Sequence, residues 1–346
     1  MNNTGKKIPV CILGATGMVG QKFLELLENH PQFEVVALAA SEKSTGKKYG
    51  EIVNWQQDLP LPSKYANFVL HECKSGIPGK IAFSGLDSSV AGEIETDFAE
   101  NGYIVISNSK NHRMNGHVPL LVPEVNHEHL ELVKKQNFSS GGMIITNPNC
   151  SVVGLTMALK PLNDLWNVES VDVVTLQALS GAGYPGVPSM EIVDNIIPYI
   201  SGEEEKIETE PGKILGTFSN GIIDFHSMKI NAQCNRVCVL NGHLECMTVK
   251  LSKKATSSEI IAAWNNFRSP VTGLISSPPQ LLQYFYESNY PQPRKQRHLG
   301  MTVSIGRLQE ATFGRWKFVI LSHNTVRGAA GGAILNAELV VRQGYL

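Results

Sequence analysis

The chain has 346 residues, of which 42% are hydrophobic and 18% are charged, and its formal net charge at pH 7 is −1. This length predicts two domains, and the composition excludes a disordered protein. The lack of a basic block argues against nucleic acid or a membrane as partner. No stretch reaches the roughly 18 apolar residues of a membrane span, and the N-terminus lacks the apolar core of a signal peptide, so we expect a cytoplasmic protein.

A nucleotide-binding turn is predicted near the N-terminus. The apolar strand Ile8 to Leu13 leads into Gly14-Ala15-Thr16-Gly17-Met18-Val19-Gly20, and a helical pattern follows from Gln21 to Asn29. Gly14 permits a tight turn, Gly17 lets a pyrophosphate approach the backbone, and Gly20 allows close helix–strand packing. Such turns also occur without ligands, but the strand before it and the helix after it favour a dinucleotide site.

The end of the second predicted strand, Phe33 to Ala40, favours NADP over NAD. An NAD-selective site usually ends this strand with an acid that holds the ribose 2′-hydroxyl. Here the strand is followed by Ser41, with Lys43 and Ser44 close behind, and these groups suit a 2′-phosphate. Glu42 is an acid in the same stretch, so a charged loop exposed to solvent is the alternative to a 2′-phosphate site.

Further alternation of strands and helices predicts a doubly wound parallel sheet. Lys80–Gly85 and Tyr103–Asn108 are predicted strands, with a helix over Ser88–Asn101 between them. Ligands bind at the carboxyl ends of such strands, which is where Ser84 and Gly85 lie. Arg113 follows in a polar loop, where it can clamp a phosphate or simply lie at the surface.

The segment Thr146-Asn147-Pro148-Asn149-Cys150-Ser151 is the strongest candidate for catalysis. The apolar run Gly142–Ile145 precedes it and a helical pattern follows it, which predicts a strand, a sharp turn and a helix that starts near Cys150. Unpaired N–H groups and the helix dipole at that end favour a thiolate and can hold an oxyanion. A small buried thiol is the alternative.

The second half is β-rich and predicts a large, mainly antiparallel sheet. Val168–Leu179 contains one polar residue, Gln177, whose burial would require a hydrogen-bond partner. Asn235–Leu240 and His243–Leu251 are predicted as strand, turn and strand. His243 is a natural partner for a catalytic cysteine, but the chain has ten histidines and spacing alone does not choose this one.

Two other features have structural interpretations. Cys234, Cys238, His243 and Cys246 lie close in sequence, but no C-x-x-C pair is present, so strands of a sheet explain them better than a metal site. The tail from His323 to Leu339 predicts a helix with a glycine-rich entry, whose small residues allow close approach to another helix or to a cofactor.

Taken together, these motifs resemble the aspartate-semialdehyde dehydrogenase family, and most closely its archaeal and fungal branch, over nearly the whole chain. The resemblance rests on Gly14–Gly20, Ser107-Asn108 with Arg113, Val122–Asn126, Asn147–Cys150, Gln177–Gly183, Glu203–Lys206, Arg236 with His243, and Asn324–Gly328. It implies an α/β fold with an N-terminal Rossmann domain (1–149, completed by a C-terminal helix at 325–346) and an α+β catalytic and dimerisation domain (150–324).

The resemblance also implies the site residues. Cys150 would be the nucleophile, His243 the acid and base, and Gln177 would orient the acyl intermediate. Arg113, Lys206, Arg236, Asn149 and Glu203 would bind substrates, with Glu204 as a substitute for Glu203. NADP would be held by Gly14, Thr16, Gly17, Met18, Val19, Gly20, Ser41, Lys43, Ser44, Ser84, Gly85, Ser180, Gly181 and Asn324. No metal is implied, and a homodimer or dimer of dimers is expected.

The implied reaction is the reversible, NADP-dependent conversion of L-aspartate 4-semialdehyde and phosphate into L-4-aspartyl phosphate through a thioester, in lysine, threonine and methionine biosynthesis. His243 would remove the proton of the thiol–aldehyde adduct as hydride departs. An acyl-CoA reductase of the malonyl-CoA type or an acetylglutamyl-phosphate reductase on the same scaffold is an alternative. A non-catalytic NADP-binding regulatory protein is another.

Overall fold

The computed structural model describes residues 6–346, so the beginning of the polar N-terminal stretch lies outside the described residues. Contacts between Cα atoms divide the chain into two units. The first extends to Pro119 and includes Glu131–Asn147, and the second comprises Leu120–Leu130 and Pro148–Leu346. Within the described part of the chain, no helix is both long and apolar enough to cross a membrane.

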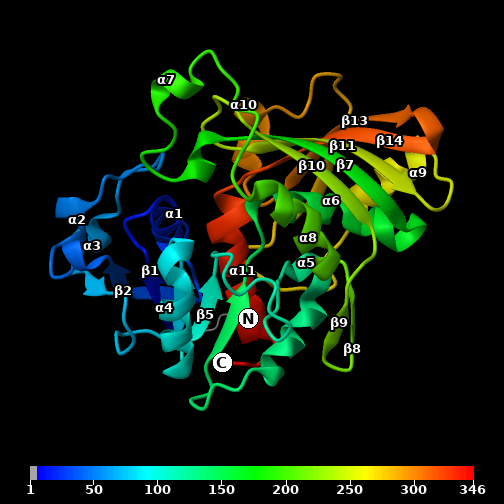
Figure 1. Cartoon of the computed structure of the whole chain (residues 1–346). Helices are drawn as coiled ribbons and strands as arrows, with labels where there is room; N and C mark the ends of the chain where they lie inside the picture. The colour runs from blue at the N-terminus through cyan, green and yellow to red at the C-terminus, as the bar shows by residue number, and fades with distance from the viewer. Residues whose placement is uncertain (1–5) are drawn as a thin grey trace. The chain divides into compact units, whose positions relative to one another are not determined.

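The first unit is built on a six-stranded parallel sheet in the order β3-β2-β1-β4-β5-β6, drawn mainly in blue and cyan in Figure 1. Its elements are β1 (Ile8–Leu13), α1 (Met18–Leu27), β2 (Phe33–Ala40), the 3₁₀ turn Glu42–Ser44, α2 (Tyr49–Ile52), α3 (Ser63–Ala66), β3 (His71–Glu72), β4 (Ile81–Ser84), α4 (Ser88–Glu100), β5 (Ile104–Ser107) and β6 (Met143–Thr146). The strand order reverses between β1 and β4, which is where ligands bind in sheets of this kind. The predicted doubly wound sheet is confirmed.

The second unit is built on a six-stranded mixed sheet in the order β10-β7-β11-β14-β13-β12. Its strands are β7 (Val168–Gln177), β8 (Thr217–Ser219), β9 (Ile222–Asp224), β10 (Lys229–Arg236), β11 (His243–Leu251), β12 (Leu282–Phe285), β13 (Val303–Ala311) and β14 (Arg315–Ser322), with β8 and β9 forming a separate hairpin. The three central pairings are antiparallel, whereas β10 with β7 and β12 with β13 are parallel.

Helices α6, α8 and α9 cover one face of this mixed sheet (Figure 1). The helical elements are α5 (Pro123–Asn126), α6 (Cys150–Trp166), α7 (Ser189–Ile192), α8 (Glu203–Ile214), α9 (Ser257–Asn265), α10 (Pro293–Gln296) and α11 (Gly331–Arg342), with 3₁₀ segments at His127–Lys135, Leu179–Ala182, Arg297–Leu299 and Thr312–Gly314 and a π-helix at Val326–Ala330. The core of the unit lies between α6 and the sheet, where Leu155, Leu159, Val249 and Ile320 are fully buried. This burial on one face explains the alternating pattern of β11.

The prediction of a strand over Asn235–Leu240 that pairs through a turn with His243–Leu251 is wrong. β10 ends at Arg236, and β7 lies between β10 and β11 and pairs with both. β7 is long enough to bond two neighbours along its length, which a hairpin between β10 and β11 would prevent. Residues 237–242 instead cross the end of β7, where Val239 and Leu240 accept backbone hydrogen bonds from Leu179 and Ser180.

Candidate active site

Cys150 is the first residue of α6, so the predicted strand, turn and helix are confirmed. Asn149 is the N-cap residue, and its Oδ1 accepts a hydrogen bond of 3.0 Å from the backbone N–H of Ser151. The thiol therefore lies at the positive end of a 17-residue helix. That position favours a negative charge on the sulfur or on an oxygen next to it.

His243 is the partner of this thiol. Its Nε2 lies 3.2 Å from Cys150 Sγ, although 93 residues separate the two in the sequence. On the other side of the ring, the backbone N–H of Ala178 donates a hydrogen bond of 3.0 Å to Nδ1. Because an N–H can only donate, Nδ1 carries the lone pair and the neutral ring holds its proton on Nε2, facing the sulfur.

The imidazole of His243 is held in its neutral form. Burial first, and the nearby Arg236 guanidinium second, lower the pKa of His243 to about 3. A neutral ring with its proton on Nε2 is a hydrogen-bond donor towards Sγ. The pair can therefore stabilise a thiolate, or an oxyanion formed beside it, without an imidazolium.

Glu203, at the start of α8, connects several of the predicted substrate residues. Its Oε1 lies 2.6 Å from Lys206 Nζ, and its Oε2 accepts hydrogen bonds from Asn149 Nδ2 at 2.9 Å and from Gln177 Nε2 at 3.3 Å. Burial by itself raises the pKa of Glu203, but the Lys206 ammonium and these hydrogen bonds outweigh burial and lower the pKa below its ordinary value. Glu203 is therefore ionised at neutral pH. Glu204 instead accepts a hydrogen bond of 3.1 Å from the backbone N–H of Cys234.

Arg236, at the end of β10, lies on the same side as the imidazole. Its Nη1 donates a hydrogen bond of 2.7 Å to the carbonyl of Ala178, which orients the guanidinium. A Cβ added to Gly181 would come within 2.9 Å of that nitrogen and 3.2 Å of His243 Cε1. Gly181 thus lies directly against both side chains, and only a glycine leaves them undisturbed.

Glu210 belongs to this cluster and is not among the residues expected from the sequence. Its Oε2 accepts a hydrogen bond of 2.8 Å from the backbone N–H of Asn149. Glu203 and Glu210 are seven residues apart on α8, which is two helical turns, so both reach Asn149 from the same face. The i, i+7 spacing of two acids is the signal that would have found Glu210. Asn149 itself, expected to bind substrate, contacts Glu203, Glu210 and Ser151.

Most of the predicted nucleotide residues lie in the first unit, whereas Ser180, Gly181 and Asn324 belong to the second. Gly14 has φ +74°, which is the left-handed turn expected of it. A Cβ on Gly20 would lie 2.3 Å from the Gly14 carbonyl, and one on Gly14 would lie 2.9 Å from the Gly85 carbonyl. These glycines bring the turn after β1 against the end of β4, with Thr16 in that turn and Met18 and Val19 at the start of α1. A dinucleotide pyrophosphate fits beside such a glycine-lined helix N-terminus.

A cavity of about 540 Å³ lies beside the end of β2. Ala40, Ser41, Glu42 and Lys43 line it on one side, with Leu86 and Val90 among the apolar residues on the other. Ser44 follows in the same 3₁₀ turn. The apolar wall suits an adenine ring, and the Ser41 hydroxyl and Lys43 ammonium suit a phosphorylated ribose, while Glu42 and Glu72 add two carboxylates to the lining.

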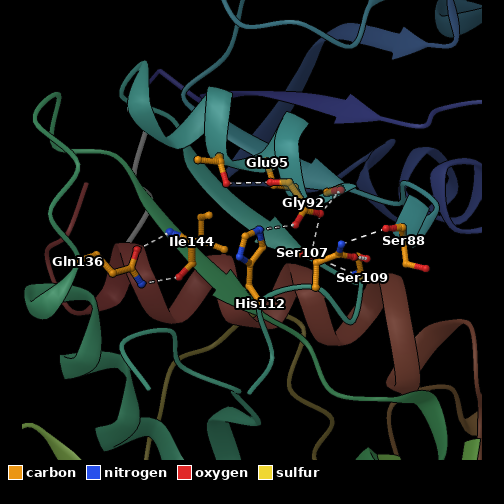
Figure 2. A network of polar contacts seen from close by, with 11 residues as sticks. Ser88, Gly92, Glu95, Ser107, Ser109, His112, Gln136 and Ile144 are labelled. Atoms are coloured by element: carbon orange, nitrogen blue, oxygen red, sulfur yellow. Dashed lines mark hydrogen bonds and ion pairs between the residues drawn. The ribbon is translucent and has the colours of Figure 1, made fainter. Parts of the chain in front are cut away.

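Ser84, expected at the cofactor, is held by a buried carboxylate instead. Glu95 Oε1 accepts hydrogen bonds from Ser84 Oγ at 2.6 Å and from Ser107 Oγ at 2.8 Å, and Glu95 Oε2 lies 3.6 Å from His112 Nε2. Figure 2 shows Glu95 of α4 reaching the end of β5, with His112 beside it. Ser107 Oγ accepts in turn from the N–H of Ser109, so Glu95 fixes two strand ends and the loop that follows.

Three further predicted residues make internal contacts. Arg113, in the first unit, is buried and donates from Nη2 to the carbonyl of Asn108 at 2.7 Å. In the second unit, Asn324 Nδ2 donates to Ser180 Oγ at 2.8 Å, and Asn324 Oδ1 accepts from the N–H of Gly242 at 2.9 Å. Residues 6–346 contain no group of three or more His, Cys, Asp or Glu side chains arranged to hold a metal.

The chain is similar to known proteins over nearly its whole length. The family description "Semialdehyde dehydrogenase, NAD binding domain" matches residues 9–133, and "Semialdehyde dehydrogenase, dimerisation domain" matches residues 159–327. The chain is 45% identical over 340 residues to the aspartate-semialdehyde dehydrogenase of Archaeoglobus fulgidus, covering 96% of this chain and 98% of that protein. It is 44% identical over 352 residues to that of Schizosaccharomyces pombe, covering 97% of this chain and 99% of that protein.

Solved structures show the same likeness. The Candida albicans aspartate-semialdehyde dehydrogenase with NADP superposes with a TM-score of 0.91 at 41% identity, over 98% of this chain and all of that one. The Vibrio cholerae enzyme II complexed with ASA gives a TM-score of 0.79 at 26% identity, with 98% of this chain and all of that one covered. With archaeal and fungal relatives matched from end to end, this chain belongs to the aspartate-semialdehyde dehydrogenase family.

Proposed function

We propose that this chain catalyses the reversible, NADP-dependent, phosphorylating oxidation of L-aspartate 4-semialdehyde to L-4-aspartyl phosphate. The observation that carries the proposal is the 3.2 Å contact between Cys150 Sγ and His243 Nε2 at the N-terminus of α6. The relatives named above, including the fungal structure with NADP, support the same reaction. They do not favour the acyl-CoA or acetylglutamyl-phosphate reductases.

The chemistry of the carbon begins at the thiolate of Cys150. Sγ attacks the aldehyde carbon, a C–S bond forms, and the carbonyl electron pair moves to oxygen. The Nε2–H of His243 then donates a hydrogen bond to that oxyanion. The Ala178 hydrogen bond to Nδ1 supports this donor role, in which the ring does not remove a proton from the adduct. Loss of hydride, for which NADP is the acceptor when bound, leaves a thioester on Cys150.

The thioester is resolved by phosphate. A phosphate oxygen attacks the thioester carbon, the C–S bond breaks, and Cys150 leaves as thiolate with the acyl phosphate as product. Arg113 and Lys206 are the proposed phosphate ligands, because a guanidinium and an ammonium both match its charge. In the biosynthetic direction these steps run in reverse.

Opposite charges are available for both ends of the amino-acid substrate. We assign the α-carboxylate to Arg236 and the α-ammonium to Glu203, whose carboxylate is ionised and largely buried. The contacts of Glu204 with β10 support Glu203 rather than Glu204 for this role. Gln177, hydrogen-bonded to Glu203, orients the acyl group.

The cofactor role goes to residues 1–149, and the glycine turn and the cavity at Ser41 and Lys43 fit NADP. Lys43 would face the 2′-phosphate, and Ser180, Gly181 and Asn324 would lie towards the nicotinamide end. We further propose a cytoplasmic enzyme of lysine, threonine and methionine biosynthesis that acts as a homodimer or a dimer of dimers, with residues 150–324 as the catalytic and dimerisation domain. The matched dimerisation description supports the assembly.

A coupled assay tests the proposal. In one assay, purified protein is given NADP, phosphate and aspartate semialdehyde. In parallel assays, it is given NADPH together with malonyl-CoA or with acetylglutamyl phosphate. Turnover of the semialdehyde alone is expected, and turnover of a rival substrate alone would overturn the assignment. Cys150→Ala should abolish turnover with NADP affinity retained, whereas Cys246→Ala, at an exposed thiol, should leave both intact. An active Cys150→Ala variant would exclude the thioester route.

A further inference from the structure

Glu124 and Arg327 come from two motifs of the sequence and have no role in the reaction as proposed, and they meet in the second unit. Glu124 of α5 and Arg327 of the π-helix are 203 residues apart, yet Arg327 Nη1 lies 2.8 Å from Glu124 Oε1. Their side chains are 0% and 1% exposed. Arg327 Nε also donates to the carbonyl of Met301 at 2.7 Å, so the guanidinium is held on two sides.

The ion pair anchors a rare backbone conformation. Residues Val326–Ala330 form a π-helix, with hydrogen bonds of 3.1 Å from Gly328 N–H to the His323 carbonyl and 3.0 Å from Ala330 N–H to the Thr325 carbonyl. The π-helix is rare in proteins, and single π-turns are frequently found at functional sites. Here the turn makes a wider loop of backbone just before α11.

The π-helix presses its backbone against the nucleophile. A Cβ added to Gly328 would lie 2.8 Å from Cα, Cβ and the carbonyl oxygen of Cys150. Atoms at that distance overlap, so the absence of a side chain at Gly328 lets the two backbones meet. The position of the π-helix thus limits where the sulfur can lie.

Asn324, two residues before the π-helix, contacts the chain next to His243, the other member of the catalytic pair. Asn324 accepts a hydrogen bond from the N–H of Gly242, the residue immediately before His243. Asn324 also donates to Ser180, which follows the Ala178–Leu179 segment that holds the imidazole and guanidinium. One stretch of chain, Asn324–Gly328, therefore lies against the backbone of Cys150 and also contacts the residue before His243.

We propose that Glu124 and Arg327 are positioning residues, which hold the π-helix Val326–Ala330 against Cys150 and thereby set the distance between Sγ and His243 Nε2. The inference rests on the proposed function for its catalytic consequence, but the reactivity of the thiol tests it separately. Neither residue contacts the sulfur, and both act through Gly328.

Substitution of one or both partners separates positioning from stability. Removing one charge leaves the other buried without a partner of opposite charge, whereas replacing both residues by apolar residues of similar size is often tolerated. We expect Arg327→Met and Glu124→Gln each to lower the melting temperature more than the double variant Glu124→Met/Arg327→Met does. The double variant should still lose about tenfold to hundredfold in kcat, because a small displacement of reacting groups has that effect. Its KM values should stay near those of the wild type.

The independent readout is alkylation of Cys150 by iodoacetamide as a function of pH, followed by mass spectrometry on the full-length protein. In the double variant the alkylation profile should move to higher pH, because the sulfur is less well placed for the Nε2–H and the helix end. A folded double variant whose kcat and alkylation profile match the wild type would overturn the proposal and leave the pair a structural contact. The alkylation result stands even when the wild-type enzyme proves inactive on aspartate semialdehyde, so the two failures are distinguishable.

A glycine substitution decides the matter should the double variant not fold. Gly328→Ala places a methyl group against Cys150 and should slow both turnover and alkylation. Gly212→Ala is the matched control, since its added Cβ has only the His226 carbonyl nearby, at 3.4 Å. Equal alkylation and turnover in Gly328→Ala and Gly212→Ala would refute the proposal.

Discussion

The backbone N–H of Ala178 donates a hydrogen bond of 3.0 Å to Nδ1 of His243, and this contact decides which ring nitrogen carries the proton. The neutral imidazole presents Nε2–H to Cys150 Sγ, while burial and Arg236 lower the pKa of the ring to about 3. At neutral pH, His243 is therefore an uncharged ring that donates from Nε2. A histidine of ordinary pKa would instead alternate between a neutral and a positively charged ring.

This tautomer predicts different effects for two substitutions of His243. His243→Ala removes the donor and should lower kcat by about 10²- to 10³-fold, the usual loss for one oxyanion donor. His243→Gln keeps an amide N–H at similar reach and should lose distinctly less. Steady-state kinetics with aspartate semialdehyde measure the difference. Equal losses in the two variants would mean that the ring acts as a proton acceptor.

The same burial predicts acid sensitivity of the fold. The folded pKa of His243, about 3, lies below the value near 6.5 of an unfolded histidine, so the unfolded chain takes up a proton first. The stability that the neutral ring contributes is complete above pH 6.5 and is lost as the pH falls towards 3. At pH 5 the loss is about 2 kcal/mol. Urea unfolding at pH 7.5 and pH 5 should show a smaller drop for His243→Gln than for the wild type, and parallel drops would contradict the assignment.

The features that sequence predicts well here are local ones. Gly14 and Gly20 predict the glycine turn after β1, because the positive φ of Gly14 and the close approach of Gly20 to Gly14 involve residues that are near in sequence. Cys150 is predictable for the same reason, since the strand, the turn and the helix around it are contiguous. The family motifs then point to His243.

The features that were missed depend on pairing across the chain. β10 and β11 read as a hairpin, but β7 lies between them, and no local signal shows this insertion. The donor on Ala178 is a backbone group whose residue type is irrelevant to its role. The ion pair of Glu124 with Arg327 joins motifs from opposite ends of the second unit, so the sequence shows two motifs but not their contact.

Substitution of the two neighbouring acids of α8 should distinguish their roles. Glu203→Gln removes a buried charge that Lys206, Asn149 and Gln177 all contact, so KM for aspartate semialdehyde should rise about tenfold or more. KM for phosphate should change as well, because Lys206 loses its partner. Glu204→Gln is the control, since an amide oxygen can still accept from Cys234 N–H. A larger effect for Glu204→Gln would reverse the assignment.

Reversing the charge of Lys43 should weaken discrimination between the two nicotinamide cofactors. Lys43 lines the cavity at the end of β2, where a 2′-phosphate would lie. Lys43→Glu should raise KM for NADP about tenfold and leave KM for NAD nearly unchanged, because only NADP carries the phosphate. Lys47→Glu changes an exposed charge a few residues further on and serves as the control. A parallel change in both cofactors would place the phosphate elsewhere.

Glu95 is expected to stabilise the first unit as a hydrogen-bond acceptor rather than as a charge. Burial raises the pKa of Glu95, and the hydroxyls of Ser84 and Ser107 both donate to its Oε1. Because the folded pKa is raised, the stability that the protonated carboxyl contributes is complete below the unfolded value of about 4.3 and is lost as the pH rises towards the folded pKa. Glu95→Gln keeps an accepting oxygen without the charge, so its thermal stability relative to the wild type should improve from pH 4 to pH 8.

The variant Glu95→Leu is the control for Glu95→Gln, because leucine removes both the charge and the hydrogen-bond acceptor. It leaves two buried hydroxyls without their acceptor, which costs about 1–3 kcal/mol for each. Its melting temperature should therefore fall below those of both Glu95→Gln and the wild type. Thermal unfolding of the three proteins across this pH range measures the order. Were Glu95→Leu as stable as Glu95→Gln, the two serine contacts would contribute nothing, and backbone pairing and packing would suffice to hold the strand ends of β4 and β5.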